Sequence, residues 1–342
     1  MDVYYSEQQD LHDPRFHLVL GKVRRHKEQP KRAELLLEGV RSLGLGITQP
    51  EDFGPAPRAA VHSPEYLRFL QEAFVLWQNA ADPGPEVVPN MHPNRPPGGY
   101  PETILGRAGW HMADGGCPIG PNTWEAACAA GNVAVQGAEA LIGGVKEAYS
   151  LCRPPGHHAY QDMAGGFCFL NNAAMAAQRL RTRYDRVAIL DVDEHHGNGT
   201  LAIFYSRADV LHLSIHVDPR QFYPFFWGYP QERGEGEGES FNVNLPLPLG
   251  TDDEAYLAVL DRALSTISGF APGALVVALG LDAYENDPLA GLAVSTDGFK
   301  RIGASIGRLG IPTLLVQEGG YLSPDLGLNL ASFLSGFLSL RR

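Results

Sequence analysis

The chain has 342 residues, of which 44% are hydrophobic, and it carries 39 acidic against 27 basic residues for a formal net charge of -12. The hydrophobic share suffices for a folded core, and we see no basic block, which argues against nucleic-acid and anionic-membrane partners and favours cationic substrates. The first residues lack a signal-peptide pattern and no run approaches about 18 apolar residues, so we expect a cytoplasmic protein.

Helical and strand patterns alternate along the chain. We expect helices over 30–43, 64–80, 123–142, 171–182, 253–267, 297–308 and 325–339. Apolar, strand-like segments lie at 147–152, 186–193, 274–281 and 311–316. This alternation predicts an α/β fold with a largely parallel central sheet flanked by helices. Because no repeat or low-complexity run interrupts it, we expect one domain over residues 1–342.

Two segments lack such a pattern. The first, about 83–122, is too rich in Pro and Gly for regular structure, and a loop of that length in a compact domain is usually functional or mobile. The second, 217–240, contains Phe222, Tyr223, Phe225, Phe226, Trp227 and Tyr229. So many aromatic residues outside a periodic element favour a pocket wall or an interface.

The run 191–199 is the most informative in the chain, and it reads Asp-Val-Asp-Glu-His-His-Gly-Asn-Gly at the end of an apolar strand. If the chain stays extended there, Asp193 and His195 point the same way and both reach one ion, with Asp191 one step deeper. An oxygen together with a nitrogen donor suits Zn²⁺ better than Mg²⁺ or Ca²⁺, which prefer oxygen alone. The sequence therefore predicts a metal site that needs a third ligand.

The other three predicted strands are also followed at once by polar residues. The segments that follow them are 153–158 (Arg-Pro-Pro-Gly-His-His), Asp282, and 317–321 (Gln-Glu-Gly-Gly-Tyr). Ligands bind outside the carboxyl ends of the strands in an open α/β sheet. We therefore expect the four strand ends to converge on one crevice.

These motifs carry a resemblance to a known family. They are Pro154-Pro155-Gly156-His157-His158, Gly165-Gly166-Phe167-Cys168, Asp191-x-Asp193-x-His195-His196-Gly197, Leu281-Asp282 and Glu318-Gly319-Gly320-Tyr321. Together they resemble the zinc-dependent histone deacetylase superfamily, and the chain length and residues 90–125 are most similar to the bacterial acetylpolyamine amidohydrolases. The resemblance covers nearly the whole chain.

The resemblance implies a role for each motif position. The zinc ligands would be Asp193, His195 and Asp282, one ion per chain. The tandem histidines His157 and His158 would exchange protons with water and the leaving amine, which suits a side chain whose pKa lies near the working pH. Tyr321, on a flexible Gly-Gly hinge, would donate a hydrogen bond to the developing oxyanion.

Some neighbours of these residues match the family pattern, and others depart from it. Asp191 matches the acid that orients His157, and with Ser214 it also resembles a structural K⁺ site. Asn198 stands where many histone deacetylases carry an acid beside His158. Because an amide cannot stabilise an imidazolium as a carboxylate does, we expect His158 to be the base. Strand alternation would turn Glu194 away from the metal, which predicts a structural role for it.

The resemblance also implies how substrate is selected. Phe167 and Tyr223 would form the two sides of a narrow acyl-chain tunnel, and the 83–122 insertion would form a homodimer and narrow the entrance. Gly116 stands where the family often holds an acid that meets the substrate, and Asp114 and Glu102 are candidates to replace it. Specificity for polyamines is therefore less secure than deacetylation.

The leading hypothesis is hydrolysis of the N-acetyl amide of a small amine through a metal-activated water. Three alternatives stay open: a protein acetyl-lysine deacetylase, a two-metal ureohydrolase, and a noncatalytic acetyl-amine binding protein. The ureohydrolase is disfavoured because no second acid lies two residues after Asp282. The four cysteines, at 117, 128, 152 and 168, have no paired metal spacing and should be free thiols.

Overall fold

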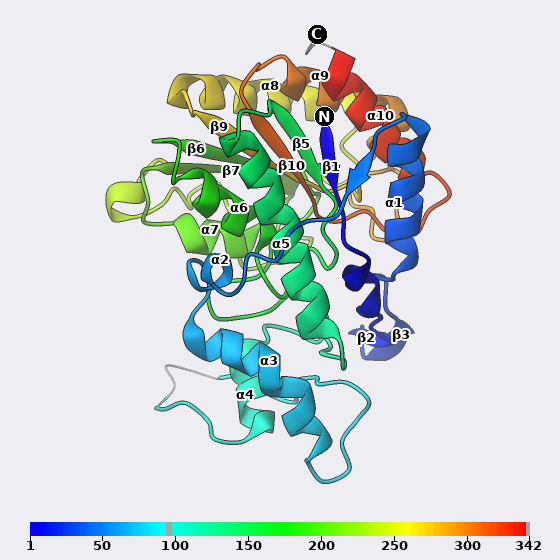
Figure 1. Ribbon diagram of the computed structural model, residues 1–342, viewed down its shortest axis with the longest axis vertical. Helices are drawn as coiled ribbons and strands as arrows, with labels where there is room; N and C mark the ends of the chain where they lie inside the picture. Colours follow the sequence, from blue (N-terminus) through cyan, green and yellow to red (C-terminus); the bar gives the residue numbers. More distant parts are fainter. Residues whose placement is uncertain (94–97, 340–342) are drawn as a thin grey trace.

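The computed structural model describes residues 1–93 and 98–339, which fold around one eight-stranded sheet (Figure 1). Its strand order is β4-β1-β5-β10-β9-β6-β7-β8, and every neighbouring pair is parallel. The strands are β1 (Asp2–Tyr4), β4 (Ile47–Thr48), β5 (Glu147–Ser150), β6 (Val187–Asp191), β7 (Val210–Val217), β8 (Asn242–Leu247), β9 (Ala274–Leu279) and β10 (Thr313–Gln317). The predicted α/β fold with a largely parallel sheet is confirmed.

Helices cover both faces of the sheet and make two apolar cores, as buried parallel strands require. One core joins the sheet to α3 (Pro64–Gln78), α5 (Thr123–Ile142) and α6 (Asn172–Leu180). The other joins it to α1 (Lys31–Ser42), α8 (Asp253–Phe270), α9 (Thr296–Gly307) and α10 (Leu326–Ser339). Each of these helices lies within a few residues of a predicted one.

The prediction that the whole 83–122 segment lacks regular structure is wrong. It contains α4 (Ile104–His111), where the Thr103 side chain accepts a hydrogen bond from the Gly106 N–H and so caps the first turn. Figure 1 shows α4 beside α3 at one end of the molecule. Residues 94–97 of the same segment lie outside the described residues.

Several other elements were not predicted. They include α2 (Ala56–Ala59), α7 (Asn198–Phe204), β1, β4, β7 and β8. The α2 helix and strands β1 and β4 are shorter than the windows in which periodicity becomes visible. The prediction for 217–240 holds except for a single 3₁₀ turn at Gly236–Gly238.

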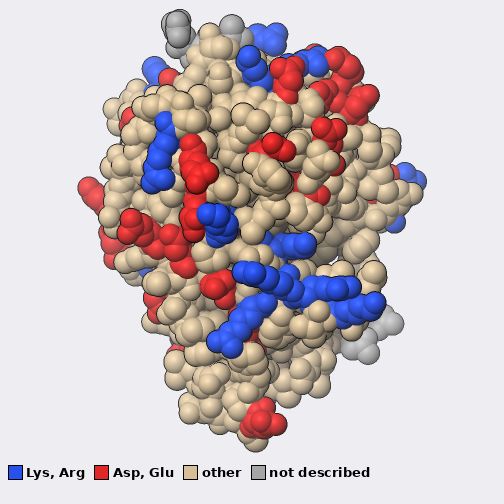
Figure 2. All heavy atoms as spheres, turned by 90° about the vertical axis from the view of Figure 1, so that its right-hand side faces the viewer, with Lys and Arg blue, Asp and Glu red and all other residues tan. Residues whose placement is uncertain are grey.

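A two-stranded antiparallel hairpin, β2 (Phe16–Val19) and β3 (Lys22–Arg25), stands apart from the main sheet. It lies at one side of the molecule below α1 (Figure 1), and the face on that side carries a band of Lys and Arg side chains (Figure 2). Among the residues that the structure describes, no helix is both long and apolar enough to cross a membrane.

Candidate active site

The site begins where β6 ends at Asp191, and the chain then turns instead of continuing as a strand. The Asp191 Oδ1 accepts a hydrogen bond from the Asp193 N–H at 3.1 Å, and the Asp193 Oδ1 accepts one from the His195 N–H at 2.9 Å. Aspartate side chains commonly bond the backbone two residues on in this way. The expected extended conformation is therefore wrong beyond Asp191, and consecutive turns bring Asp193 and His195 to the same side.

Strand β9 pairs with β6, and Asp282 follows the end of β9. Its side chain lies beside those of Asp193 and His195. The His195 Nδ1 lies 3.1 Å from the Asp193 Oδ1 and 3.1 Å from the Asp282 Oδ2. One donor atom from each of the three side chains lies within 4.8 Å of the others, and all three residues are buried. Burial and the neighbouring Asp193 both raise the pKa of Asp282.

The donor set fits a divalent metal ion. Two carboxylates buried side by side are stable only when a cation or a proton offsets their charge. Two oxygens and one nitrogen are ligands that Zn²⁺ accepts, and three protein ligands leave one position open. A second trio, His157, Cys168 and Glu318, is also close enough to hold an ion. It fits less well, because the Glu318 Oε2 already accepts the N–H groups of Gly156 and His157 and burial raises the pKa of the Cys168 thiol.

The tandem histidines follow β5 and lie beside this cluster, with ring centroids 4.0 Å apart. The His157 Nδ1 lies 2.9 Å from the Asp191 Oδ2. Burial by itself lowers the pKa of His157, but Asp193 and Asp191 outweigh it and raise the pKa to about 10. His157 is therefore the cationic member of the pair.

His158 has a different partner. Its Nδ1 lies 2.6 Å from the Asn198 Oδ1, and the Asn198 amide in turn donates to the Tyr160 hydroxyl at 2.9 Å. Burial, followed by the charges of His157 and His195, lowers the pKa of His158 well below its ordinary value. A neutral His158 that donates from Nδ1 to the amide oxygen has its Nε2 free to accept a proton.

Tyr321 follows β10 and closes the site from the other side, with its ring 5.7 Å from Phe167 and nearly perpendicular to it. The two preceding glycines are each required by the local geometry, and a flexible hinge at this point stays a prediction. A Cβ on Gly319 would lie 2.2 Å from the Asp282 Oδ2, and Gly320 has a φ of +107°. Both positions therefore need glycine, one for close approach of the carboxylates and the other for its backbone conformation.

Arg32 and Asp287, which no sequence pattern singles out, hold the Tyr321 segment in place. Arg32 of α1 donates to the carbonyls of Glu318 and Gly320, and its guanidinium lies 4.8 Å from the centre of the Tyr321 ring. The Asp287 Oδ2 accepts the Tyr321 N–H at 2.7 Å, while its Oδ1 accepts the Leu289 N–H at 2.8 Å. The tyrosine is thus tied to α1 and to the loop after β9.

Arg32 belongs to a buried charge cluster with Glu28 and Arg153. A single Glu28 oxygen, Oε1, lies 2.8 Å from the Arg32 Nη1 and 2.8 Å from the Arg153 Nε. Burial raises the pKa of Glu28, but the two arginines outweigh it and lower the pKa to about 2. The cluster therefore stays ionised and anchors α1 against the loop that carries the tandem histidines.

The Glu194 side chain turns away from the metal cluster. Its Oε2 accepts the N–H groups of Gly291 at 2.6 Å and Leu292 at 3.2 Å. Glu194 thus fixes the loop that follows Asp287. Asp191 and Ser214 are neighbours across β6 and β7, and the Ser214 hydroxyl lies 2.9 Å from the His216 Nδ1. K⁺ binding between them stays a prediction.

A cavity of about 390 Å³ leads from the surface to His158, His195 and Tyr321. Phe167 and Tyr223 also line it, and the Tyr223 ring lies perpendicular to that of His158 with the centroids 5.0 Å apart. The preceding residue, Phe222, stacks its ring on that of His195 with the centroids 5.0 Å apart. Of the six aromatic residues in 217–240, Tyr223 and Phe225 line the cavity, so the prediction of a pocket wall is confirmed for these two.

Asp114 lies in the outer part of this cavity. Its Oδ2 accepts hydrogen bonds from the Tyr223 hydroxyl at 2.6 Å and from the Gly166 N–H at 3.2 Å, and its Oδ1 accepts from the Gly116 N–H at 2.7 Å. Asp114 is thus the acid that faces the pocket beside Gly116. Glu102, the other candidate, does not line this cavity.

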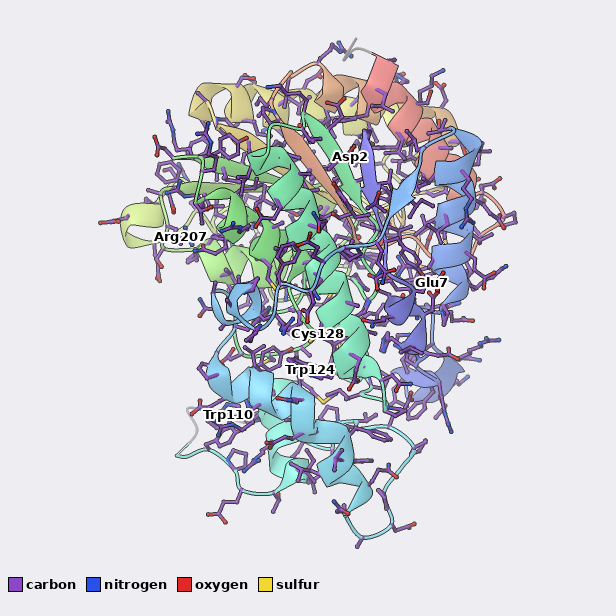
Figure 3. The ribbon with its side chains drawn as sticks, in the orientation of Figure 1. Asp2, Glu7, Trp110, Trp124, Cys128 and Arg207 are labelled. Carbon is purple, nitrogen blue, oxygen red and sulfur yellow. The ribbon has the colours of Figure 1, made fainter. Side chains whose placement is uncertain are left out.

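The four cysteines are free, as predicted. Cys128 lies on α5, on the side turned to the viewer in Figure 3, and burial raises the pKa of its thiol to about 12. Burial also raises the pKa of Cys117, Cys152 and Cys168. Thiols that stay protonated are poor nucleophiles, so the chemistry belongs to the histidines, the carboxylates and Tyr321.

Comparison with known proteins agrees with this site. The model of the histone deacetylase domain matches residues 26–337. The chain is 48% identical over 342 residues to the acetylpolyamine amidohydrolase of Burkholderia pseudomallei, and the match covers 100% of both chains. It is 44% identical over 341 residues to acetylpolyamine amidohydrolase 2 of Pseudomonas aeruginosa, and that match covers 99% of both chains. It superposes on a crystal structure of the acetylpolyamine aminohydrolase from Burkholderia pseudomallei with a TM-score of 0.97 at 48% identity, covering 99% of both chains. The chain therefore belongs to the histone deacetylase family.

Proposed function

We propose that this protein is a metal-dependent deacetylase that hydrolyses the N-acetyl amide of small acetylated amines. The observation that carries the proposal is the cavity of about 390 Å³ whose inner end brings together His158, His195 and Tyr321. Between Phe167 and Tyr223 an acetylated alkylamine presents its amide to these groups while its chain contacts aromatic rings. The relatives named above are acetylpolyamine amidohydrolases, which supports the same substrate class.

Asp193, His195 and Asp282 would hold the metal ion, which we propose is Zn²⁺. When bound, such an ion lowers the pKa of a coordinated water to about 7 and polarises the acyl oxygen. The residues around it divide the proton transfers. Neutral His158 takes a proton from the attacking water as the water oxygen bonds to the acyl carbon.

His157 and Tyr321 stabilise the negative charge that forms during the reaction. His157, whose Nδ1 lies 2.9 Å from the Asp191 Oδ2, stabilises negative charge that develops on the acyl group. The Tyr321 hydroxyl remains protonated because burial raises its pKa, and it donates a hydrogen bond to the acyl oxygen. When the C–N bond breaks, the amine leaves with a proton from the histidine pair, and acetate is the second product.

The 83–122 segment supplies Asp114, Gly115 and Gly116 to the outer part of the cavity. We include in the proposal that this segment excludes folded proteins and forms a homodimer, as its resemblance to the amidohydrolase insertion implies. A cytoplasmic location is part of the same proposal. Shortening the segment between α3 and α4 should then give a more monomeric enzyme that accepts bulkier acetyl-lysine peptides.

Acetate release tests the function directly. We expect purified protein to hydrolyse one or more of acetylputrescine, acetylcadaverine and acetylspermidine faster than acetyl-lysine histone peptides. Tyr321→Phe, which keeps the ring and removes the hydroxyl, is the matched inactive control. Faster hydrolysis of histone peptides than of every free acetylated diamine would replace the proposal with a protein deacetylase, and no acetate from any substrate would favour a noncatalytic binding protein.

A further inference from the structure

The β2–β3 hairpin forms one wall of the cavity entrance. His17, Leu18, Val19 and Leu20 all line the cavity, and Leu20 at the turn is 96% exposed. His17 packs its ring against Phe167 at 5.8 Å, so the hairpin is continuous with the acyl-chain tunnel. A substrate tail that leaves the tunnel therefore passes along this hairpin.

The hairpin and the two residues that follow it carry the cations Lys22, Arg24, Arg25 and Lys27. The first three are exposed, and among the described residues none of the four forms an ion pair. The nearest acid along the chain, Glu28, is buried with Arg32 and Arg153. Residues 22–27 are thus a basic cluster in a chain of net charge -12, and the expectation that no basic block exists is wrong here.

Strand pairing places two of these cations beside residues that line the entrance. In the hairpin register Val19 pairs with Lys22 and His17 pairs with Arg24. Cross-strand partners project from the same face, so Lys22 and Arg24 share the face on which His17 and Val19 line the cavity. The pKa of His17 is lowered to about 4 by burial, with His26 and Lys27 adding to the effect, so positive potential already reaches this wall.

Asp114 carries the opposite charge at the same cavity. Its three hydrogen-bond donors, the Tyr223 hydroxyl and the N–H groups of Gly116 and Gly166, are all neutral. A carboxylate has about four acceptor positions, so one remains for an ammonium group. The entrance therefore offers one anion on the tunnel side and cations on the hairpin side.

We propose that the preferred substrate is an acetylated diamine that also carries a carboxylate at its far end, that is, a side-chain N-acetylated diamino acid. Its free ammonium group pairs with Asp114, its carboxylate pairs with Lys22 and Arg24, and its methylenes contact Val19 and the aromatic walls. An acetylated diamine without a carboxylate satisfies Asp114 but leaves both hairpin cations facing a third positive charge. This inference rests on the deacetylase function proposed above and narrows its substrate class.

Two test substrates differ only in the carboxylate group. Nε-acetyl-lysine is acetylcadaverine with a carboxylate on the carbon that bears the free amine. We expect kcat/KM to be higher for Nε-acetyl-lysine, mostly through a lower KM. In Lys22→Gln/Arg24→Gln the ratio of the two kcat/KM values should fall about tenfold, because each exposed ion pair contributes up to about 1 kcal/mol.

Lys300→Gln is the matched control, since Lys300 is an exposed cation on α9 that does not line the cavity. The ratio should not change in that variant, and an unchanged thermal midpoint in both variants shows that folding is intact. A wild-type preference for acetylcadaverine, or an unchanged ratio in the double variant, overturns the inference. If the ratio is unchanged but the double variant loses retention on a polyanion resin, the cations belong to a macromolecular partner instead. Absence of acetate from both substrates would point to failure of the proposed function itself.

Discussion

Replacing Asn198 with aspartate tests which histidine is the base. The change exchanges an amide nitrogen for an oxygen at a buried position whose Oδ1 lies 2.6 Å from the His158 Nδ1. The Tyr160 hydroxyl, which now accepts from the Asn198 amide at 2.9 Å, can rotate and donate to the new carboxylate. The geometry is thus kept, and the main change is one negative charge beside His158.

The size of the change in the His158 pKa can be worked out from the separation of the two charge centres, which is larger than the distance between the bonded atoms. Two unit charges about 4 Å apart interact by about 4 kcal/mol at an effective dielectric constant near 20, which alone would raise the pKa of His158 by about three. The new carboxylate must itself be buried, and that cost offsets part of the attraction. We therefore expect the pKa of His158, now well below its ordinary value, to rise by about one to two.

If His158 is the base, the direction in which the pH profile of kcat/KM moves is determined. A base must be unprotonated to act, so a higher pKa moves the acidic limb of the profile of kcat/KM against pH towards higher pH. Activity of Asn198→Asp should fall on the acidic side of the profile and approach the wild-type value as the pH rises. Tyr160→Phe removes the same hydroxyl contact without adding charge, and its acidic limb should stay in place. An unmoved limb in Asn198→Asp would exclude His158 as the base.

Three further predictions concern other parts of the site. Asp282→Ala should lose the bound metal, which elemental analysis of the purified protein measures, and full occupancy would remove Asp282 from the ligand set. Tyr321→Phe should keep metal and fold but lose about 10²-fold or more in kcat. Asp287→Ala should lower kcat about tenfold with little change in KM, because its Oδ2 accepts the Tyr321 N–H at 2.7 Å and leaving a buried donor without a partner costs about 1–3 kcal/mol. Asp287→Asn, which retains one acceptor oxygen, should recover part of that loss, and an equal fall in both variants would contradict the positioning role.

The main elements of the fold could be predicted because their signals are local. The strands β6, β9 and β10 are mostly apolar, and the polar residues that carry the chemistry lie at or just beyond the end of each strand. Parallel strands place such ends on one edge of the sheet, so spacing along the chain was enough to predict convergence. The close approach at Gly319 and the positive φ of Gly320 could not be predicted, because the sequence shows that a glycine is present but not which geometry requires it.

The α4 helix shows why the rest could not be predicted. Its sequence, Ile-Leu-Gly-Arg-Ala-Gly-Trp-His, contains two glycines and lies among prolines, which disfavours a helix. Contacts from distant residues stabilise it instead. The His111 ring bonds the Tyr100 hydroxyl at 2.9 Å and the Asp162 carbonyl at 2.7 Å. Tertiary partners of this kind leave no periodic signal.

The buried cluster of Arg32, Glu28 and Arg153 was missed for a related reason. Its members come from α1, the segment before it, and the loop after β5, and nothing in those segments distinguishes these residues from surface charges. Removing one member would leave an unpaired charge in the interior, a change that commonly costs about 3–5 kcal/mol. The same arginine holds the carbonyls beside Tyr321, so stability and catalysis depend on it together.

Net charge was the least informative of the sequence properties, and the hairpin explains why. A total of -12 describes the field far from the protein, where charges are summed and attract cations. Within a Debye length of about 8–10 Å, only nearby charges act on a substrate, and near the entrance these are Asp114 and the cations of residues 22–27. Long-range attraction therefore favours a purely cationic amine, whereas local selection favours a zwitterionic one, which has no net charge. Raising the salt concentration should weaken the first more than the second, so the preference for Nε-acetyl-lysine over acetylcadaverine should persist at an ionic strength where the overall rates have fallen.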